Sequence, residues 1–219
     1  MEKLILYGNK TVARGTYLGL RNHPKYEVVA FTVDREYLEG DRFCDLPIVP
    51  FDTVRDAYPP HTHKMHIAVG FVSNNKIRKE RYLSSKEMGY QMVSFINHTT
   101  SVDPKMIGDH CVIGEYCTIS SMARIGNNVT ISAGCIIAED VVIGDHCFLS
   151  GGVAVAGGAR IGSGCYLGIR SIIRNKITIG NHCVIGAGAL MLENAEDNSV
   201  YLGEPATLLS ISSDKLPLG

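Results

Sequence analysis

Residues 123–152 read ARIGNNVTISAGCIIAEDVVIGDHCFLSGG, and a large aliphatic residue returns at every sixth position of this stretch. The same step continues in both directions, so that every sixth residue from Ile107 to Met191 is a large aliphatic residue or methionine. From Cys111 to Ala189, the residue two positions earlier in each hexad is mostly smaller and apolar, and six of the seven cysteines occupy this position. A fixed internal period of this kind indicates a repeat architecture.

The hexads predict short strands separated by tight corners. Two apolar columns, two residues apart, would face inward from each strand, and a Gly, Ser or Ala after most of the aliphatic positions marks the corner. Three strands and three corners make one coil, and about five such coils would stack at roughly 4.8 Å, the spacing of hydrogen-bonded strands. In this interior we expect the six cysteines to pack as small apolar side chains.

Residues 1–98 have a different rhythm. Apolar, strand-like segments at 3–8, 26–34, 65–71 and 90–96 alternate with helix-like segments at 11–22 and 74–89. This alternation predicts a small parallel α/β sheet. Its ligand would lie at the carboxyl ends of the strands, near Gly8 and Gly70, where helix amino termini can receive phosphate. The stretch from Gly8 to Thr11 does not match GxGxxG, which disfavours NAD or FAD.

The overall charge excludes several classes of partner. Of the 219 residues, 21 are Lys or Arg and 22 are Asp or Glu, with a formal net charge of −1. Neither sign forms a run, so we expect neither a nucleic acid nor an anionic membrane as partner. The first apolar segment is too short for a signal peptide, and no window approaches the length of a membrane span, which predicts a cytoplasmic protein. An odd number of cysteines without CxxC indicates neither a disulfide framework nor a zinc ribbon.

The hexads resemble those of the left-handed parallel β-helix acyltransferases, and the handedness is taken from this resemblance. The front half is similar to the sialic-acid and nucleotide-aminosugar acetyltransferases: a Gly ends the first strand, Asp34 closes the second, and VGF (69–71) and NNKIR (74–78) follow. The closing segment YLGEPATLL (201–209) is similar as well. The resemblance implies a Rossmann-like nucleotide-sugar-binding domain at 1–98, a β-helix acyl-CoA domain at 99–205 and a tail at 206–219.

This family implies a function and a set of site residues. Its members are trimers that transfer an acetyl group from acetyl-CoA to the amino group of a nucleotide-linked deoxyaminosugar, for surface glycan synthesis, at sites between subunits. By this resemblance the sugar nucleotide would contact Gly8, Asn9, Lys10, Asp34, Gly70 and Phe71. Acyl-CoA would contact Phe148, Gly157, Gly168, Ile169 and Ala187, with Arg170, Arg174 and Lys176 within reach of its phosphates. No metal is expected.

The sequence departs from the family at the expected catalytic positions. Glu139 stands where relatives carry the histidine base, Asp140 stands at the supporting acid, and Phe148 replaces a second histidine that meets the thioester. Glu139 could be the base, strengthened by repulsion from Asp140 and by burial against a neighbouring subunit. The sugar amine could instead attack the thioester unaided, so that catalysis is mostly positioning. A third interpretation is that the chain binds without catalysis or performs another acyl transfer.

The alternatives are a sugar O-acyltransferase and a noncatalytic or metal-dependent protein such as the β-helical carbonic anhydrases. Two groups of histidines bear on a metal: His61, His63 and His66, and His110, His146 and His182. The first group has no carboxylate or cysteine close by. The second group falls on one corner, with its members two coils or roughly 10 Å apart, which is too far for one ion within a single chain.

Overall fold

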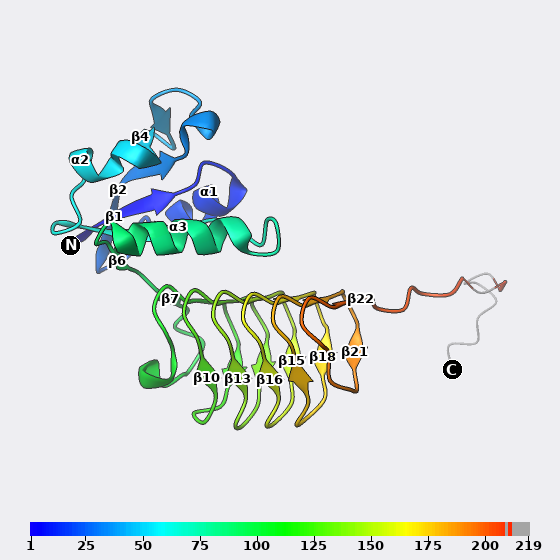
Figure 1. Cartoon of the computed structure of the whole chain (residues 1–219). Coiled ribbons are helices and arrows are strands. Elements are labelled where there is room, and N and C mark those ends of the chain that lie inside the picture. Colours follow the sequence, from blue (N-terminus) through cyan, green and yellow to red (C-terminus); the bar gives the residue numbers. More distant parts are fainter. Residues whose placement is uncertain (209, 212–219) are drawn as a thin grey trace.

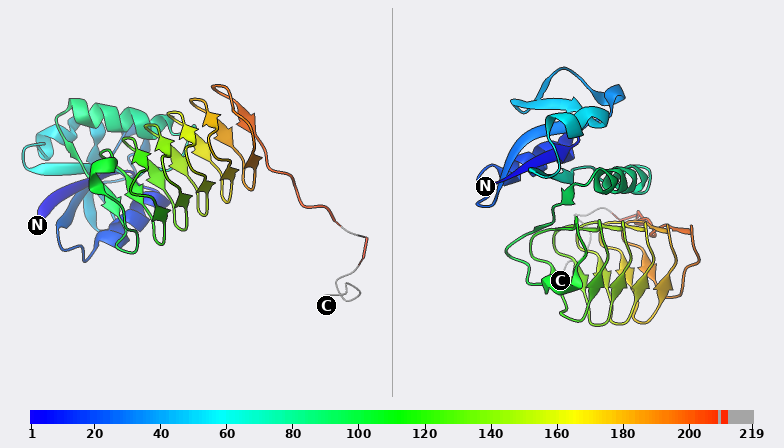
Figure 2. Two further views of the ribbon diagram at one scale, coloured as in Figure 1. Left: turned by 90° about the horizontal axis from the view of Figure 1, so that it is seen from below. Right: turned by 60° about the vertical axis from the view of Figure 1, so that its left-hand side comes forward.

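The structure is a computed structural model that describes residues 1–208, 210 and 211. A layered α/β part lies beside a column of stacked coils, and helix α3 (Lys76–Glu87) runs between the two (Figure 1). Figure 2 shows the same arrangement from two further sides. Residues 202–208 leave the last coil as an extended segment. The predicted tail at 206–219 lies partly outside the described residues.

The α/β part is built on a six-stranded sheet in the order β3-β4-β2-β1-β5-β6. All neighbours are parallel except β3 and β4. The central strands are apolar because both of their faces are covered. The bounds are β1 Glu2–Tyr7, β2 Tyr26–Val33, β3 Arg42–Phe43, β4 Leu46–Pro50, β5 His63–Ile67 and β6 Gln91–Met92. The predicted Rossmann-like sheet is confirmed, with β3 and β4 added.

The helices lie near the predicted segments. α1 spans Thr11–Leu20, α2 Val54–Ala57 and α3 Lys76–Glu87, with 3-10 turns at Arg35–Tyr37, Phe51–Thr53 and Pro104–Met106. Gly8 joins β1 to α1 at φ +127°, where a Cβ would also lie 2.9 Å from the Ala68 carbonyl oxygen, so this turn requires glycine. In the described part of the chain, no helix has the length and apolar character needed to cross a membrane.

The coils form a three-sided left-handed β-helix, as predicted, with two-residue strands on every side. We name its three sides the docking face (β22-β20-β17-β14-β11-β8-β7), on which the front part lies, the apolar face (β21-β18-β15-β12-β9) and the charged face (β10-β13-β16-β19). The bounds are β7 Phe95–Ile96, β8 Val112–Ile113, β9 Thr118–Ile119, β10 Arg124–Ile125, β11 Thr130–Ile131, β12 Ile136–Ile137, β13 Val142–Ile143, β14 Phe148–Leu149, β15 Ala154–Val155, β16 Arg160–Ile161, β17 Tyr166–Leu167, β18 Ile172–Ile173, β19 Thr178–Ile179, β20 Val184–Ile185, β21 Leu190–Met191 and β22 Val200–Tyr201.

The register of the strands gives a coil of 18 residues. Ile136 pairs with Ala154 in the following coil and with Thr118 in the preceding one, all in parallel. Both predicted inward columns are buried and form one continuous core. The six cysteines of the hexads are free and buried in that core, so their predicted packing role is confirmed.

The reason for the glycines that follow the aliphatic residues differs from the prediction. The left-handed residue of a corner stands two positions later, for example at His110, Asn128 or His146. A glycine such as Gly162 is needed because the next coil passes so close that a Cβ would lie 2.6 Å from the carbonyl carbon of Gly180.

Three corners separate the faces, and each repeats once per coil. The histidine corner, between the charged and docking faces, comprises residues 109–110, 127–128, 145–146, 163–164 and 181–182. The isoleucine corner, between the docking and apolar faces, comprises 115–116, 133–134, 151–152, 169–170 and 187–188. The glutamate corner, between the apolar and charged faces, comprises 121–122, 139–140, 157–158, 175–176 and 193–194.

The first coil is joined to the sheet through β7, which pairs with β8 on the docking face. The Thr99 and Thr100 hydroxyls accept the N–H groups of Tyr116 and Cys117, so these threonines cap the open end of the first coil. His98, which precedes them, is exposed. The division at 1–98, 99–205 and 206–219 remains a prediction. Strand β7 falls within the predicted front segment but belongs to a sheet of the β-helix.

Candidate functional site

The predicted carboxylates lie on the glutamate corner and face open space. Glu139 and Asp140 are exposed, and Asp140 takes the left-handed corner conformation at φ +56°. In the next coil Gly158 donates its N–H to the Glu139 carbonyl oxygen at 2.9 Å. A Cβ on Gly157 would lie 3.9 Å from Glu139 Oε2. Because neither glycine carries a side chain, neither of them covers Glu139 from the next coil.

The predicted acyl-CoA residues fall mostly on the isoleucine corner. Ile169 and Ala187 are exposed there in successive coils. Gly168 is buried, and a Cβ on it would lie 2.6 Å from the backbone nitrogen of Ala187. The close approach of the next coil therefore explains this glycine.

The glutamate and isoleucine corners are separated by one side of the coil. Such a side contains six residues, which at roughly 3.3 Å each gives a separation on the order of 15–20 Å. Glu139 and Gly157 are brought together on one corner, and Ile169 and Ala187 on the other. One chain alone does not bring the two pairs together.

The docking face brings a predicted substrate residue against a predicted acyl-CoA residue. Phe71, in the loop after β5, lies with its ring centroid 5.2 Å from that of Phe148 and 4.7 Å from that of Tyr166. The Phe148 and Tyr166 rings stack at 6.0 Å. Phe148, at the place of the family's second histidine, thus belongs to an aromatic cluster, and its ring has no proton to exchange. Phe71 itself is 50% exposed.

Helix α3 is anchored to the docking face by a buried arginine. Arg78 is 2% exposed and donates to Thr130 Oγ1 at 2.5 Å and to the Cys147 carbonyl oxygen at 3.0 Å. Within the described residues it has no carboxylate partner, and its Nε has no hydrogen bond. Burial lowers the pKa of Arg78 to about 10. The guanidinium also lies 5.7 Å from the Phe148 ring centroid, which favours the cation.

The contacts of α3 follow its length along the stack. Near its carboxyl end Tyr82 and Lys86 donate to the Asp109 carboxylate in the first coil. At its amino end Asn75 donates to the Cys165 carbonyl oxygen at 3.2 Å, and Asn74 to that of His182 at 3.3 Å. The helix therefore contacts successive coils in order.

Asp34 lies at the junction between the sheet and α3. Its Oδ2 accepts from the Tyr7 hydroxyl at 2.8 Å and pairs with Arg81 Nη2 at 3.1 Å. Burial, followed by the Asp34 hydrogen bond, raises the pKa of the Tyr7 phenol. This predicted substrate residue thus has a structural role, because its Oδ2 joins the sheet to α3.

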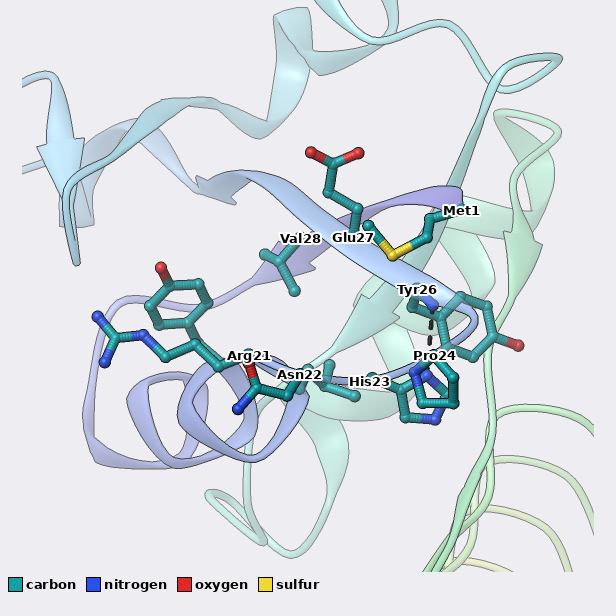
Figure 3. A pocket seen from close by; sticks show the side chains of 10 residues that line it. Met1, Arg21, Asn22, His23, Pro24, Tyr26, Glu27 and Val28 are labelled. Atoms are coloured by element: carbon teal, nitrogen blue, oxygen red, sulfur yellow. Dashed lines mark hydrogen bonds between the residues drawn. The ribbon is translucent and has the colours of Figure 1, made fainter.

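A pocket of about 470 Å³ opens at the amino-terminal edge of the sheet (Figure 3). It is lined by Met1, Arg21, His23 and Tyr26 among others. No predicted site residue lies in it. A different pocket, of about 420 Å³, opens at the opposite edge, where β1 ends and α1 begins. Its lining comprises Asn9, Lys10, Thr11, Arg14, Glu39, Arg42, Phe43 and Ile48.

The second pocket contains two of the predicted substrate residues. Asn9 Nδ2 donates to the Tyr37 carbonyl oxygen at 2.6 Å, and Lys10 pairs with Glu39 at 3.2 Å in an exposed position. The Arg14 guanidinium lies 5.6 Å from the Phe43 ring centroid. Lys10 is the N-cap residue of α1 and makes no side-chain cap, so the first amides of the helix have no side-chain partner there. Sequence reasoning missed Arg14 and Arg42, although Arg14 follows Lys10 by one helical turn.

The histidines do not form a metal centre. His63 and His66 lie three residues apart on β5 and so point to opposite faces of the sheet, and His61 is exposed in the preceding turn. In residues 1–208, 210 and 211, no group of three or more His, Cys, Asp or Glu side chains could hold a metal ion.

Comparisons with known proteins agree with the fold. Residues 122–157 and 158–192 match the family model described as bacterial transferase hexapeptide (six repeats). Residues 104–139 match the model of the hexapeptide repeat of succinyl-transferase. These residues are therefore hexapeptide repeats. Among curated protein sequences no match is found.

Solved structures match both parts of the chain. A variant of perosamine N-acetyltransferase from Caulobacter crescentus, in complex with CoA and GDP-perosamine, has a TM-score of 0.81 at 21% identity, covering 95% of this chain and 97% of that one. The acetyltransferase domain of PglB from Neisseria gonorrhoeae, in complex with acetyl coenzyme A, has a TM-score of 0.77 at 20% identity, with 95% and 99% coverage. WeeI from Acinetobacter baumannii has a TM-score of 0.77 at 20% identity, with 94% and 99% coverage.

At this level of identity the likeness establishes the fold. The chain is a hexapeptide-repeat protein with an α/β front part and a left-handed β-helix. It has the fold of these acetyltransferases over nearly its whole length.

Proposed function

We propose that this chain is an acyltransferase that moves an acetyl group from acetyl-CoA to the amino group of a nucleotide-linked aminodeoxysugar, in the synthesis of a surface glycan. The fold likeness supports this proposal, because the matched structures include sugar N-acetyltransferases with CoA bound. The observation that carries it is the exposed Glu139, with two glycines beside it in the next coil, at the corner where the resemblance places the catalytic base.

We further propose a homotrimer with its sites between subunits. The outward residues of the apolar face include Ile136, Ile172 and Leu190, which are 53%, 47% and 57% exposed in the single chain. A continuous apolar surface of this kind indicates a protein contact. If three such faces pack around a three-fold axis, the glutamate corner of one subunit meets the isoleucine corner of the next. That packing would unite Glu139 and Gly157 with Ile169 and Ala187 of the neighbouring subunit.

In the proposed reaction the sugar amine attacks the thioester carbonyl carbon, a C–N bond forms and the C–S bond breaks. The proton lost by the nitrogen passes to the Glu139 carboxylate, and CoA leaves as a thiolate that takes up a proton. Asp140 accepts a hydrogen bond from the neutral amine before attack. Most of the rate acceleration comes from holding the amine against the thioester.

The pocket that contains Lys10 supports a sugar nucleotide as substrate. Lys10, Arg14 and Arg42 bring three cations to the amino end of α1, which suits a diphosphate. The volume of about 420 Å³ is within the range of small-molecule sites. We therefore assign the diphosphate to this pocket and the amino sugar to the side that faces Phe71. We also propose a cytoplasmic location, since all seven cysteines are free.

A thiol-release assay tests the function. Purified protein is incubated with acetyl-CoA and a panel of UDP-, GDP- and dTDP-linked aminosugars, and both free CoA thiol and the acetylated product are measured. We expect stoichiometric release with at least one amino acceptor and none with its hydroxyl counterpart. Sugar-nucleotide binding without release would support the noncatalytic alternative, and release with the hydroxyl counterpart would support O-acyl transfer.

A further inference from the structure

A cavity of about 230 Å³ lies between the start of α3 and the histidine corner. It is lined by Ser73, Asn74, Asn75, Lys76, Lys79, His146, Gly164 and His182. None of these residues belongs to the proposed acyl-transfer site. The cavity is smaller than the usual range of sites for drug-sized ligands, so its ligand would be a small group.

A chain of hydrogen bonds determines which atom of His146 carries the proton. The Ile67 N–H donates to His110 Nε2 at 2.8 Å, so the proton of His110 is on Nδ1. That Nδ1–H donates to Asn128 Oδ1 at 2.8 Å, and Asn128 Nδ2 then donates to His146 Nδ1 at 2.8 Å. His146 Nδ1 is therefore an acceptor, and its Nε2 carries the proton.

His146 offers this proton to the cavity. The residue is 8% exposed, and no hydrogen bond of its Nε2 is present among the described residues. Burial lowers the pKa of His146 to about 4, so the ring is a neutral donor at physiological pH. The described residues give this N–H no partner, and an anionic ligand in the cavity would accept its hydrogen bond.

Helix α3 adds positive charge on the opposite side of the cavity. Lys76 and Lys79 lie in its first turns, and the N-cap residue Asn75 makes no side-chain cap, because its amide is committed to Cys165 and Arg78. The amino end of this 12-residue helix carries a partial positive charge of its own.

The loop before α3 is held in an unusual conformation. Ser73, Asn74 and Asn75 are left-handed in succession, with φ of 51°, 49° and 68°. Such residues are strained and persist where the surroundings hold them, often at a ligand site. On the other wall, Gly164 makes room for the His182 imidazole, with which a Cβ at this position would collide.

The neighbouring carboxylates are turned to other partners. Asp145 accepts the Asn127 N–H at 2.7 Å, and Glu80 lies 4.0 Å from Lys76 Nζ on the outside of α3. The lining of the cavity contains cations, amides, a hydroxyl and imidazoles, and no carboxylate.

We propose that this cavity binds a phosphate group, held by His146 Nε2–H, by Lys79 and Lys76, and by the amino end of α3. The ligand is free phosphate or the terminal phosphate of a larger molecule. None of the lining residues lies on the glutamate or isoleucine corner, and the proposal does not rest on the transfer of acetyl groups.

The test is calorimetric titration of the full chain with inorganic phosphate. We expect saturable binding that Lys79→Gln and His146→Asn each weaken at least tenfold. His146→Asn keeps an acceptor for Asn128 and removes only the Nε2 donor. Lys105→Gln, which removes an exposed lysine of the 3-10 turn at Pro104–Met106, is the matched control and should leave the affinity unchanged.

Competition distinguishes the sources of the phosphate. If CoA displaces phosphate and 3′-dephospho-CoA does not, the site holds the 3′-phosphate of CoA; if neither does, the ligand is a free anion. Absence of phosphate binding to the wild-type chain overturns the proposal, as does equal affinity in all three variants. If a variant does not fold, the imidazole nitrogen resonance of His146 in the wild-type chain decides, because it must shift on addition of phosphate.

Discussion

Glu139 is the residue on which the proposed chemistry depends. Glu139→Gln keeps the shape of the side chain and removes the proton acceptor, and we expect kcat to fall about 100-fold with KM little changed, the lower end of the effect of a general base. Steady-state thiol release measures both constants. The matched control is Glu193→Gln, three coils further along the same corner, which should retain full activity.

Full turnover of Glu139→Gln across the pH range would show that Glu139 is not the base and that positioning carries the reaction. The reverse substitution is as informative. Glu139→His restores the residue type that relatives carry at this position, and we expect it to retain activity or to admit hydroxyl acceptors.

His66 makes the stability of the fold dependent on pH. It is buried on β5, where its ring nitrogen Nδ1 donates to the Val93 carbonyl oxygen at 2.9 Å, and burial lowers its pKa to about 4. Below the pKa of about 6.5 that histidine has in the unfolded chain, the unfolded chain binds a proton that the folded chain does not bind. The free energy of unfolding therefore decreases as the pH is lowered from about 6.5 to 4.

His66→Asn preserves the hydrogen bond to Val93 and removes this proton. We expect the slope of unfolding free energy against pH to decrease by up to about 1.4 kcal/mol per pH unit between pH 4.5 and 6. Urea denaturation at several pH values measures the slope, with pH 7.5 as the reference. His110 and His146, whose pKa values are also lowered by burial, keep part of the dependence. An unchanged slope would contradict the assignment.

For single residues, the sequence predicted positions within the repeat better than it predicted side-chain contacts between the two parts of the chain. The hexad positions of Glu139 and Gly157 place them in adjacent coils at one corner, and this neighbourhood follows from the 18-residue period alone. The contact of Phe71 with Phe148 could not be predicted, because it depends on how the front part sits on the docking face. Asp34 was assigned to the substrate, and its bonds to Tyr7 and Arg81 show a structural role that no local pattern signals.

Among the elements, α3 is the one whose position the sequence concealed. Its residues indicate an exposed, charged helix, since Lys, Arg and Glu dominate it. In the structure it is covered by the docking face along one side, where Arg78 is buried with uncharged partners. A buried guanidinium needs several acceptors at once, and only the three-dimensional arrangement supplies them.

Arg78→Met tests this anchor. The substitution keeps much of the length of the side chain, and it leaves the His146 carbonyl oxygen and Asn75 Oδ1 without this donor, so we expect a loss of about 2–4 kcal/mol of unfolding free energy. Chemical denaturation measures the loss. Arg160→Met, at an exposed position on β16, is the control and should change stability by less than about 0.5 kcal/mol. Equal effects of both variants would contradict an anchoring role.

For the whole molecule, we expect the apolar face to be the contact that holds the proposed trimer together. Ile172→Lys places a charge at the middle of this face, and we expect the trimer to dissociate and thiol release to be lost with it. Light scattering coupled to size-exclusion chromatography measures the mass. Thr178→Lys, an equivalent outward position on the charged face, is the control. A wild-type chain that runs as a monomer at working concentration would contradict the intersubunit site.

The overall architecture could be predicted from the sequence to different degrees in its two parts. In the β-helix the period determines strands, faces and core together, because each coil repeats the same contacts. In the front part the alternation of segments predicted β1, β2 and β5, and the predicted segment at 90–96 contains β6 and β7. It missed β3 and β4, which lie together on one side of the sheet.

Because α3 contacts successive coils in order, its length matches the number of coils that lie beneath it. From Lys86 to Asn74 the helix and its preceding loop meet the coils that contain Asp109, Thr130, Cys147, Cys165 and His182. An extra coil inserted between Asp109 and His182 would displace all later partners by roughly 4.8 Å, about three residues of helix. The number of coils beneath α3 is therefore fixed by the length of the helix. Beyond His182 no such limit applies, and there the column could lengthen or shorten by whole coils without disturbing the front part.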